Sequence, residues 1–279
     1  MRDPSDCGQF LKLTEGMTHF RREGPADGRP IVLVHGATVP SWEFDPLVPL
    51  LWRAGFQTLR FDLYGHGASD RPPGAYTFER FARQIEDVIE ASAFPRPAMF
   101  LGHSFGAALV SAVAAAHPEW IDRMVLVAPM LDFSSSTRWT TLFQCPGLGE
   151  LSMQFIGMPA LIRRRRLRYE RIGQAHLAAR FIDQVRYAGF ARALLSMFRT
   201  GALADQSARY AALRSLERDM LVITGEQDAI IPAGHVARVR SLLPAHQHVS
   251  LLAEHNLLLT HPAEVAEALA NFGLGHSRD

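Results

Sequence analysis

Short apolar stretches alternate with helical segments along most of this chain, and this alternation limits the possible folds more than any other feature. The strand-like stretches are PIVLVHG (30–36), QTLRFDLYG (57–65), AMFLGH (98–103), DRMVLVAP (122–129), DMLVITGE (219–226) and HVSLLA (248–253). Helical patterns occupy residues 43–54, 78–92, 105–116 and 233–243, and a last helix starts near Pro262. Short β-branched runs are typical of strands buried on both faces. The alternation therefore predicts a mostly parallel sheet with helices on both faces.

Residues 9–22, near the start of the chain, follow a different pattern. The two segments LKLTEG and MTHFRR alternate between apolar and polar side chains. Such alternation is typical of strands that expose one face to solvent. We expect an antiparallel hairpin here.

One long segment, residues 131–214, interrupts the alternation. It contains helical patterns but no convincing buried strand. It carries 13 arginines against 5 acidic residues, a net charge of +8, whereas the rest of the chain has 16 basic and 23 acidic residues, a net charge of −7. We predict a helical cap inserted over the ends of the strands. Residues 1–130 and 215–279 would then form the two parts of the α/β core.

Charge and composition argue against several classes of protein. The formal net charge of +1 gives no reason to expect a nucleic-acid partner. No apolar run approaches the roughly 18 residues needed to span a bilayer, and MRDPSDCGQF lacks the apolar stretch of a signal peptide. Cys7 and Cys145 have no motif spacing, so neither a disulfide framework nor a metal site is predicted. We expect a cytoplasmic protein with no integral membrane segment, no nucleic-acid partner, no metal and no cofactor.

The most specific motif is Gly-His-Ser-Phe-Gly at residues 102–106. It lies between an apolar strand and an Ala-rich helix, which is the context of a nucleophile elbow. Gly102 and Gly106 flank the turn, where a Cβ would crowd the neighbouring strand or helix, and Ser104 is expected in strained backbone geometry. A serine hydroxyl is a poor nucleophile unless a base removes its proton. The motif alone therefore does not separate a tight turn from a catalytic serine.

Candidate partners for the serine follow two of the later strands. Asp228 comes just beyond DMLVITGE, and His255 comes just beyond SLLA. The chain order Ser, Asp, His is the order that belongs to this type of elbow. We predict a triad in which Ser104 attacks a carbonyl carbon and His255 accepts and later donates the proton. Asp228 would orient the imidazole and stabilise its cation.

At these residues the chain resembles the α/β-hydrolase superfamily, in particular serine esterases and lipases with a helical lid. The resemblance covers nearly the whole length and is weakest in the helical insertion. His35-Gly36 resembles the family's oxyanion loop, and DLYGHGASDRP (62–72) resembles its Asp-x-x-Gly-x-Gly-x-Ser segment, in which Asp62 would be structural. Asp228 follows Gly225 as in the family, but Glu254 stands where many relatives have glycine. The resemblance implies the α/β-hydrolase fold, with a mostly parallel central sheet, helices on both faces and a helical cap.

The resemblance also implies where a substrate would bind. The backbone N–H groups of Ala37 and Phe105 would form the oxyanion hole, which stabilises the negative charge that develops on the carbonyl oxygen. We expect four side chains to line the substrate pocket around them: Thr38, Trp42, Met130 and Trp139.

Rival residues exist for two members of the triad. His261 is the nearest alternative to His255, but it immediately precedes Pro262 and its position is typical of the start of a helix. Glu226 is an alternative to Asp228 as the acid. Asp132 is another, because some relatives place their acid after the strand at 122–129.

The segment RRRRLRYER (163–171) has two interpretations. A solvated helix face is the commoner fate of a run of charges. Alternatively, Arg163, Arg164, Arg165 and Arg166 form an electropositive lid that attracts acidic substrates, an acyl carrier protein or an anionic membrane surface. The sequence leaves both open.

The predicted function is that of a carboxylesterase: hydrolysis of a small-molecule ester of a small or medium apolar acyl group through an acyl-enzyme. A carbon–carbon hydrolase of the meta-cleavage-product type is an alternative, since YGHGASDRP resembles the equivalent loop there, although HGATVPSW lacks the glycine-rich run usual in those enzymes. A cofactor-free peroxidase and an acyl-carrier-linked ester hydrolase also stay open. Dehalogenases and epoxide hydrolases are disfavoured because those relatives carry Asp where Ser104 stands. A binding protein without turnover is disfavoured because it has no chemical need for all three groups.

Overall fold

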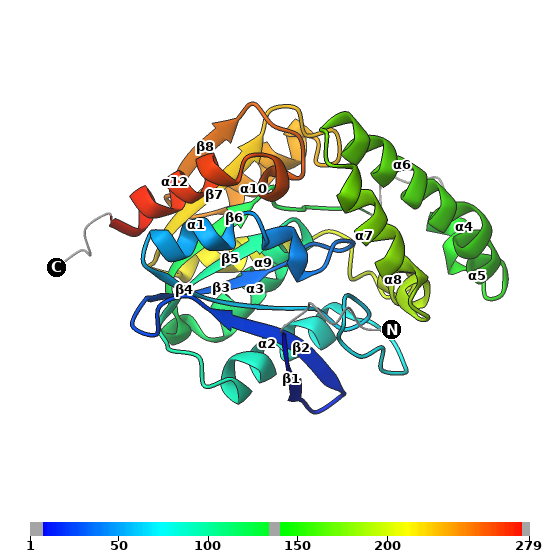
Figure 1. The fold of residues 1–279 in the computed structure, drawn as a ribbon, viewed down its shortest axis with the longest axis horizontal. Helices are drawn as coiled ribbons and strands as arrows, with labels where there is room; N and C mark the ends of the chain where they lie inside the picture. The colour runs from blue at the N-terminus through cyan, green and yellow to red at the C-terminus, as the bar shows by residue number, and fades with distance from the viewer. Residues whose placement is uncertain (1–7, 134–139, 275–279) are drawn as a thin grey trace.

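The computed structural model describes residues 8–133 and 140–274, and Figure 1 shows one central sheet with helices on both sides and further helices gathered at one end. The strands are β1 (Gln9–Lys12), β2 (Met17–Glu23), β3 (Arg29–Val34), β4 (Phe56–Phe61), β5 (Ala98–His103), β6 (Ile121–Val127), β7 (Asp219–Gly225) and β8 (Gln247–Leu251). Their order in the sheet is β1-β2-β4-β3-β5-β6-β7-β8. The pairs β1–β2 and β2–β4 are antiparallel, and all pairs from β4 to β8 are parallel. The predicted mostly parallel sheet is confirmed.

The central strands are apolar at consecutive positions because both of their faces are covered. In β3, Ile31 and Leu33 belong to the core on one face of the sheet, whereas Val32 and Val34 belong to the core on the other. Successive side chains of a strand point to opposite faces, so a doubly covered strand needs no polar alternation. The predicted N-terminal hairpin is also confirmed, with Lys12 of β1 opposite Met17 of β2.

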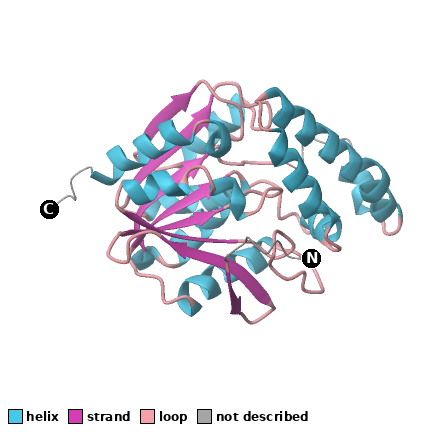
Figure 2. Cartoon of the chain, in the orientation of Figure 1, coloured by secondary structure: helices cyan, strands magenta, loops and turns pink. Residues whose placement is uncertain are grey.

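Two sets of helices cover the sheet (Figure 2). One face packs against α1 (Val48–Arg53), α11 (Leu257–Thr260) and α12 (Pro262–Leu274). The other packs against α2 (Phe78–Ala91), α3 (Phe105–Ala116) and α10 (Ala233–Leu242). A short 3-10 turn, η2 (Pro118–Trp120), precedes β6. No described helix is long and apolar enough to cross a membrane.

The helix predicted at 43–54 is split in the structure. A 3-10 turn, η1 (Ser41–Phe44), is followed by a break and then by α1. Pro46 and Pro49 have no N–H group, so neither can donate the hydrogen bond that a continuous helix would require of it. Pro49 is tolerated near the start of α1, where the N–H groups lack partners in any case.

The described residues between β6 and β7 form helices and no strand. They are α4 (Thr140–Gln144), α5 (Leu148–Ser152), the π-helical turn η3 (Met153–Gly157), α6 (Met158–Arg171), α7 (Ala175–Arg186), α8 (Phe190–Arg199), α9 (Ser207–Ala212) and the 3-10 turn η4 (Leu213–Ser215). Helices α4 to α8 stand together beside the sheet in Figure 1, and we call them the cap. Helix α9 packs instead against α3 and α10 of the core.

Ion pairs attach the cap to the core. Arg180 of α7 contacts Asp45, which follows η1. Arg168 and Arg171 of α6 both contact Glu254, in the loop after β8. These contacts hold the cap over the carboxyl ends of the parallel strands, the edge at which open α/β sheets bind ligands.

Candidate active site

Ser104 joins β5 to α3 in a strained turn. Its φ of +55° lies in the left-handed region, which is costly for a residue other than glycine. A Cβ on Gly106 would lie 2.2 Å from the carbonyl oxygen of Val34, and one on Gly102 would lie 2.3 Å from the carbonyl oxygen of Gly106. The backbones approach so closely that only glycine fits at both positions. This is the geometry expected of a nucleophile elbow.

His255 and Asp228 meet in the loops that follow β8 and β7. The Nδ1 atom of His255 lies 2.8 Å from Oδ2 of Asp228, and both side chains are about 95% buried. The other carboxylate oxygen, Oδ1, accepts hydrogen bonds from the backbone N–H groups of Ile230 and Ile231. Because an ionised carboxylate only accepts hydrogen bonds, Nδ1 carries the proton and Nε2 is left as the basic nitrogen. A general base requires this tautomer.

The surroundings keep Asp228 charged and His255 neutral. Burial raises the pKa of Asp228, but the hydrogen bonds from His255 and from the two backbone N–H groups outweigh burial, and the net pKa is lowered. Burial is also the largest influence on His255 and lowers its pKa to about 4, although Asp228 acts in the opposite direction. The positive charges of His103 and Arg165 lower the pKa of His255 further.

This pKa predicts how hydrolysis depends on pH. The base must be neutral, so kcat/KM for an uncharged ester should stay on a plateau down to about pH 5 and fall tenfold per pH unit below pH 4. An unperturbed imidazole would place the fall near pH 6.5 instead. The measurement is kcat/KM between pH 3.5 and 8 with an ester that has no ionisable group. An acidic limb at pH 6 to 7 would contradict the described environment of His255.

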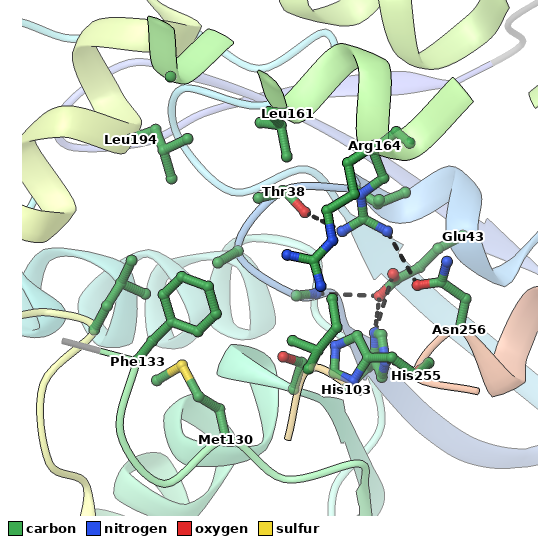
Figure 3. Close-up of a pocket in the computed structure, with 18 of the residues that line it drawn as sticks. Thr38, Glu43, His103, Met130, Phe133, Leu161, Arg164, Leu194, His255 and Asn256 are labelled. Atoms are coloured by element: carbon green, nitrogen blue, oxygen red, sulfur yellow. Dashed lines mark hydrogen bonds and ion pairs between the residues drawn. The ribbon is translucent and has the colours of Figure 1, made fainter. Parts of the chain in front are cut away.

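Ser104 and His255 line the same cavity between the core and the cap. The hydroxyl of Ser104 makes no hydrogen bond with any described residue, so it is free to turn toward the imidazole or a substrate. Thr38 lies across the cavity from Met130 in Figure 3. The rest of the wall is largely apolar and comes mainly from the cap and the loops beneath it: Phe133, Phe143, Met153, Leu161, Leu194 and Phe198.

Two backbone N–H groups are candidates for the oxyanion hole. Ala37 lines the cavity in the loop after β3. Phe105 is the first residue of α3, where a helix has N–H groups without intrahelical partners and its dipole favours negative charge. Within the described residues, neither N–H donates a hydrogen bond to another group. Both N–H groups therefore lack a partner among the described residues, but only Ala37 is one of the residues that line the cavity.

The four predicted pocket residues have different positions. Thr38 and Met130 line the cavity. Trp42 does not, because η1 turns its ring beneath Arg180 of the cap, with the guanidinium 5.0 Å from the ring centroid. Trp139 lies outside the described residues.

Two of the rival residues, Glu226 and His261, do not take part in this constellation. Glu226 is exposed, and Nδ1 of His255 bonds to Asp228. His261 sits between α11 and α12, where its Nδ1 is 2.8 Å from Oγ1 of Thr260, and it does not line the cavity. Asp132 lies in the loop that follows β6.

Asp62 supports the loops around the site, as the sequence suggested. Its Oδ1 accepts hydrogen bonds from the N–H and hydroxyl of Ser41, and its Oδ2 bonds to Nδ1 of His19 and the N–H of Ala68. Burial raises the pKa of Asp62, but His19, the charge of His35 and Ser41 outweigh burial, and the net pKa is lowered. A charged carboxylate therefore ties β2, the loop after β3 and the loop after β4 together.

Sequence reasoning missed a second buried pair beneath the elbow. Nδ1 of His103 lies 3.0 Å from Oε1 of Glu43, and its Nε2 lies 3.1 Å from the carbonyl oxygen of His255. Two acceptors on two ring nitrogens require an imidazolium cation. Burial lowers the pKa of His103, but the charge and hydrogen bond of Glu43 outweigh burial, and the net pKa is raised. Only folding brings Glu43 to His103, so spacing along the chain gave no signal for this pair.

The arginine run on α6 divides between solvent and the cavity. Arg163 and Arg166 are exposed and do not line the cavity. Arg164, Arg165 and Arg168 do line it; Arg164 is also exposed to solvent, whereas Arg165 and Arg168 are buried. The run is therefore not a single solvated face. Glu254, the departure from the family pattern, provides the carboxylate that Arg168 contacts at 2.8 Å.

Comparison with known proteins shows similarity to hydrolases along most of the chain. A model of the alpha/beta hydrolase family matches residues 31–268. A 2-hydroxymuconate semialdehyde hydrolase from Pseudomonas putida is 27% identical over 96% of this chain and 94% of that protein. A hydrolase of known structure from Pseudomonas aeruginosa is 26% identical with a TM-score of 0.75, over 98% of this chain and 100% of that one.

Other relatives match only in part. A haloalkane dehalogenase from Mycobacterium marinum is 34% identical over 39% of this chain, and the match spans 37% of the dehalogenase. The first curated relatives are generally matched over less than half of their own length, from 32% to 43%. Their names describe a haloalkane dehalogenase, a serine hydrolase-like protein and a non-heme chloroperoxidase, so these partial matches do not identify one activity for this chain.

Proposed function

Because this chain belongs to the alpha/beta hydrolase family, we propose that it is a serine hydrolase that cleaves a carboxylic ester with a small or medium acyl group. One observation carries the proposal: a serine in a strained elbow and a histidine bonded to a buried aspartate line a single cavity. The apolar wall of that cavity suits a hydrocarbon acyl chain.

The proposed reaction has two halves, acylation and deacylation, and the same groups act in both. Ser104 attacks the ester carbonyl as His255 Nε2 takes its proton, and the N–H groups of Ala37 and Phe105 bind the resulting oxyanion. His255 then gives the proton to the leaving alcohol, and an acyl-enzyme on Ser104 remains. Water attacks this acyl-enzyme by the same route, with His255 as the base, and releases the acid and the free serine.

The similarity to haloalkane dehalogenases does not favour dehalogenation. Displacement of a halide by Ser104 would form an ether, and attack of water on an ether regenerates no free hydroxyl under mild conditions. A carboxylate nucleophile would form an ester that water can cleave, but the elbow holds serine at position 104.

Carbon–carbon hydrolysis is the second candidate. The match to a 2-hydroxymuconate semialdehyde hydrolase over 96% of the chain favours it. The same groups would serve, because a carbon–carbon hydrolase also needs an activated nucleophile at a carbonyl carbon and a proton for the leaving carbon. We place it second because the HGATVPSW loop lacks the glycine-rich run of those enzymes.

A panel of 4-nitrophenyl esters tests the proposal. We expect release of 4-nitrophenol with kcat/KM at least tenfold higher for a four- to eight-carbon acyl chain than for a sixteen-carbon chain, because a single cavity with a largely apolar wall must hold the acyl group. A fluorophosphonate should label Ser104, as peptide mass analysis would show.

A parallel assay separates the second candidate. Loss of absorbance from a vinylogous 1,5-diketone would report carbon–carbon cleavage. Rapid loss of that substrate with no turnover of any aryl ester would replace the ester proposal by carbon–carbon hydrolysis. Failure of both substrates would remove both.

A further inference from the structure

The cap turns an unusually basic helix face toward the proposed catalytic groups. Leu161, Arg164, Arg165 and Arg168 of α6 all line the cavity. Their spacing of three and four residues places them on one side of the helix. A wall built only to hold a hydrocarbon would be apolar at these positions, yet three of the four side chains are cations.

Arg165 is a buried cation held only by neutral groups. Its side chain donates to Oδ1 of Asn256 at 3.1 Å and to Oγ1 of Thr38 at 2.6 Å, and the residue is 8% exposed. No carboxylate of the described residues lies within ion-pair distance of its guanidinium. A buried charge without a counter-charge is costly. An anionic ligand in the cavity would remove that cost.

Arg164 adds a second cation to the cavity wall, and unlike Arg165 it is also exposed to solvent. It makes no hydrogen bond or ion pair with a described residue, and Figure 3 shows it on the Thr38 side of the cavity. Arg168, by contrast, forms an ion pair with Glu254. Among the described residues that line the cavity, Glu43 is the one carboxylate. It already accepts hydrogen bonds from His103 and from the N–H of Gly36.

We infer that Arg164 and Arg165 form a subsite for a carboxylate carried by the ester substrate. The substrate class is an ester with one anionic end beside α6 and a hydrocarbon part against the apolar wall, such as a half-ester of a dicarboxylic acid. The planar guanidinium matches a carboxylate through two parallel hydrogen bonds. A carboxylate suits the site better than a phosphate dianion, because each further charge in a largely apolar cavity adds a desolvation cost. The ester bond in this inference rests on the proposed function, whereas the anion subsite does not.

Two matched esters test the subsite: mono-4-nitrophenyl adipate and 4-nitrophenyl hexanoate, which differ at one end by a carboxylate. The wild type should prefer the adipate, and Arg164→Gln should raise its KM by about 10- to 100-fold, as expected for loss of a charge-assisted hydrogen bond. The KM of the hexanoate should rise much less, so that Arg164→Gln loses the preference for the adipate. Arg163→Gln is the control, since it removes the same charge from the same helix outside the cavity.

Binding of free adipate, measured by titration calorimetry, gives a readout that does not need turnover. Adipate should bind the wild type and Arg163→Gln, and binding should weaken at least tenfold in Arg164→Gln. Hexanoate hydrolysis with no adipate preference and no adipate binding would overturn the subsite and leave the proposed function intact. Arg164-dependent adipate binding without hydrolysis of either ester would support the subsite and overturn the function. Tighter binding of inorganic phosphate than of adipate would overturn the assignment to a carboxylate.

Discussion

Replacement of Ser104 by alanine should lower kcat for the best aryl ester by about four to six orders of magnitude. The variant loses the only atom that can form the acyl-enzyme in the proposed reaction, while the Ala37 and Phe105 N–H groups and the cavity stay in place. The remaining rate should exceed that in buffer, because oxyanion stabilisation and binding persist. The measurement is kcat and KM by 4-nitrophenol release, with KM expected to change little.

Ser111→Ala is the matched control for this experiment. Ser111 lies on the same helix, α3, and its hydroxyl donates to the carbonyl oxygen of Ala107 at 2.7 Å, away from the cavity. Its activity should stay within a factor of about two of the wild type. Near-wild-type hydrolysis by Ser104→Ala, or fluorophosphonate labelling of a different serine, would remove Ser104 from the reaction.

The parts of the fold that follow from local patterns were predictable. Each central strand is a short apolar run because both faces of the sheet are covered, and the helix at 105–116 is an Ala-rich stretch whose buried face packs on that sheet. The elbow was also predictable. Its two glycines are required by close contacts with residues nearby in the chain and with one neighbouring strand. The split of the 43–54 helix was readable in principle from Pro46 and Pro49, which our prediction did not take into account.

The electrostatics of the site depend on contacts between segments far apart in the chain. Glu43 is 60 residues from His103, and Arg165 is 91 residues from Asn256. No spacing rule connects such positions, because the packing of the cap and of η1 on the core decides which charges meet. Trp42 illustrates the same limit: its place beside the oxyanion loop suggested a pocket residue, but η1 directs its ring toward Arg180 instead.

These contacts decide which of the charges around His255 are compensated by an opposite charge. The imidazole lies beside a charged Asp228 on one side and beside the His103 cation on the other, with ring centroids of the two histidines 5.0 Å apart. His103 is itself neutralised by Glu43, so the pair adds little net charge to the buried site. Two buried charges then remain without a counter-charge: the anion of Asp228 beside the neutral imidazole, and the cation of Arg165, which bonds only to Asn256 and Thr38 and is where an anionic substrate would contribute.

Asp228→Asn should lower kcat by about 10⁴-fold while leaving the fold intact. The asparagine is the same size, but its amide N–H₂ donates where a carboxylate oxygen accepts. When an amide N–H₂ group donates to Nδ1 of His255, the tautomer in which Nε2 carries the proton is favoured. Nε2 then cannot take the proton of Ser104. The measurements are kcat, the rate of fluorophosphonate labelling and the unfolding midpoint.

Glu226→Gln and Asp132→Asn decide whether the acid has been assigned to the right carboxylate. Glu226 is exposed two residues before Asp228, so its replacement makes the same chemical change in the same loop without touching Nδ1 of His255. Both control variants should keep at least half of the wild-type kcat. A loss near 10⁴-fold in Asp132→Asn, together with a small loss in Asp228→Asn, would move the acid to the loop after β6. The 2.8 Å contact between Asp228 and His255 would then be structural, since a group that orients the base cannot be removed without slowing the attack by Ser104.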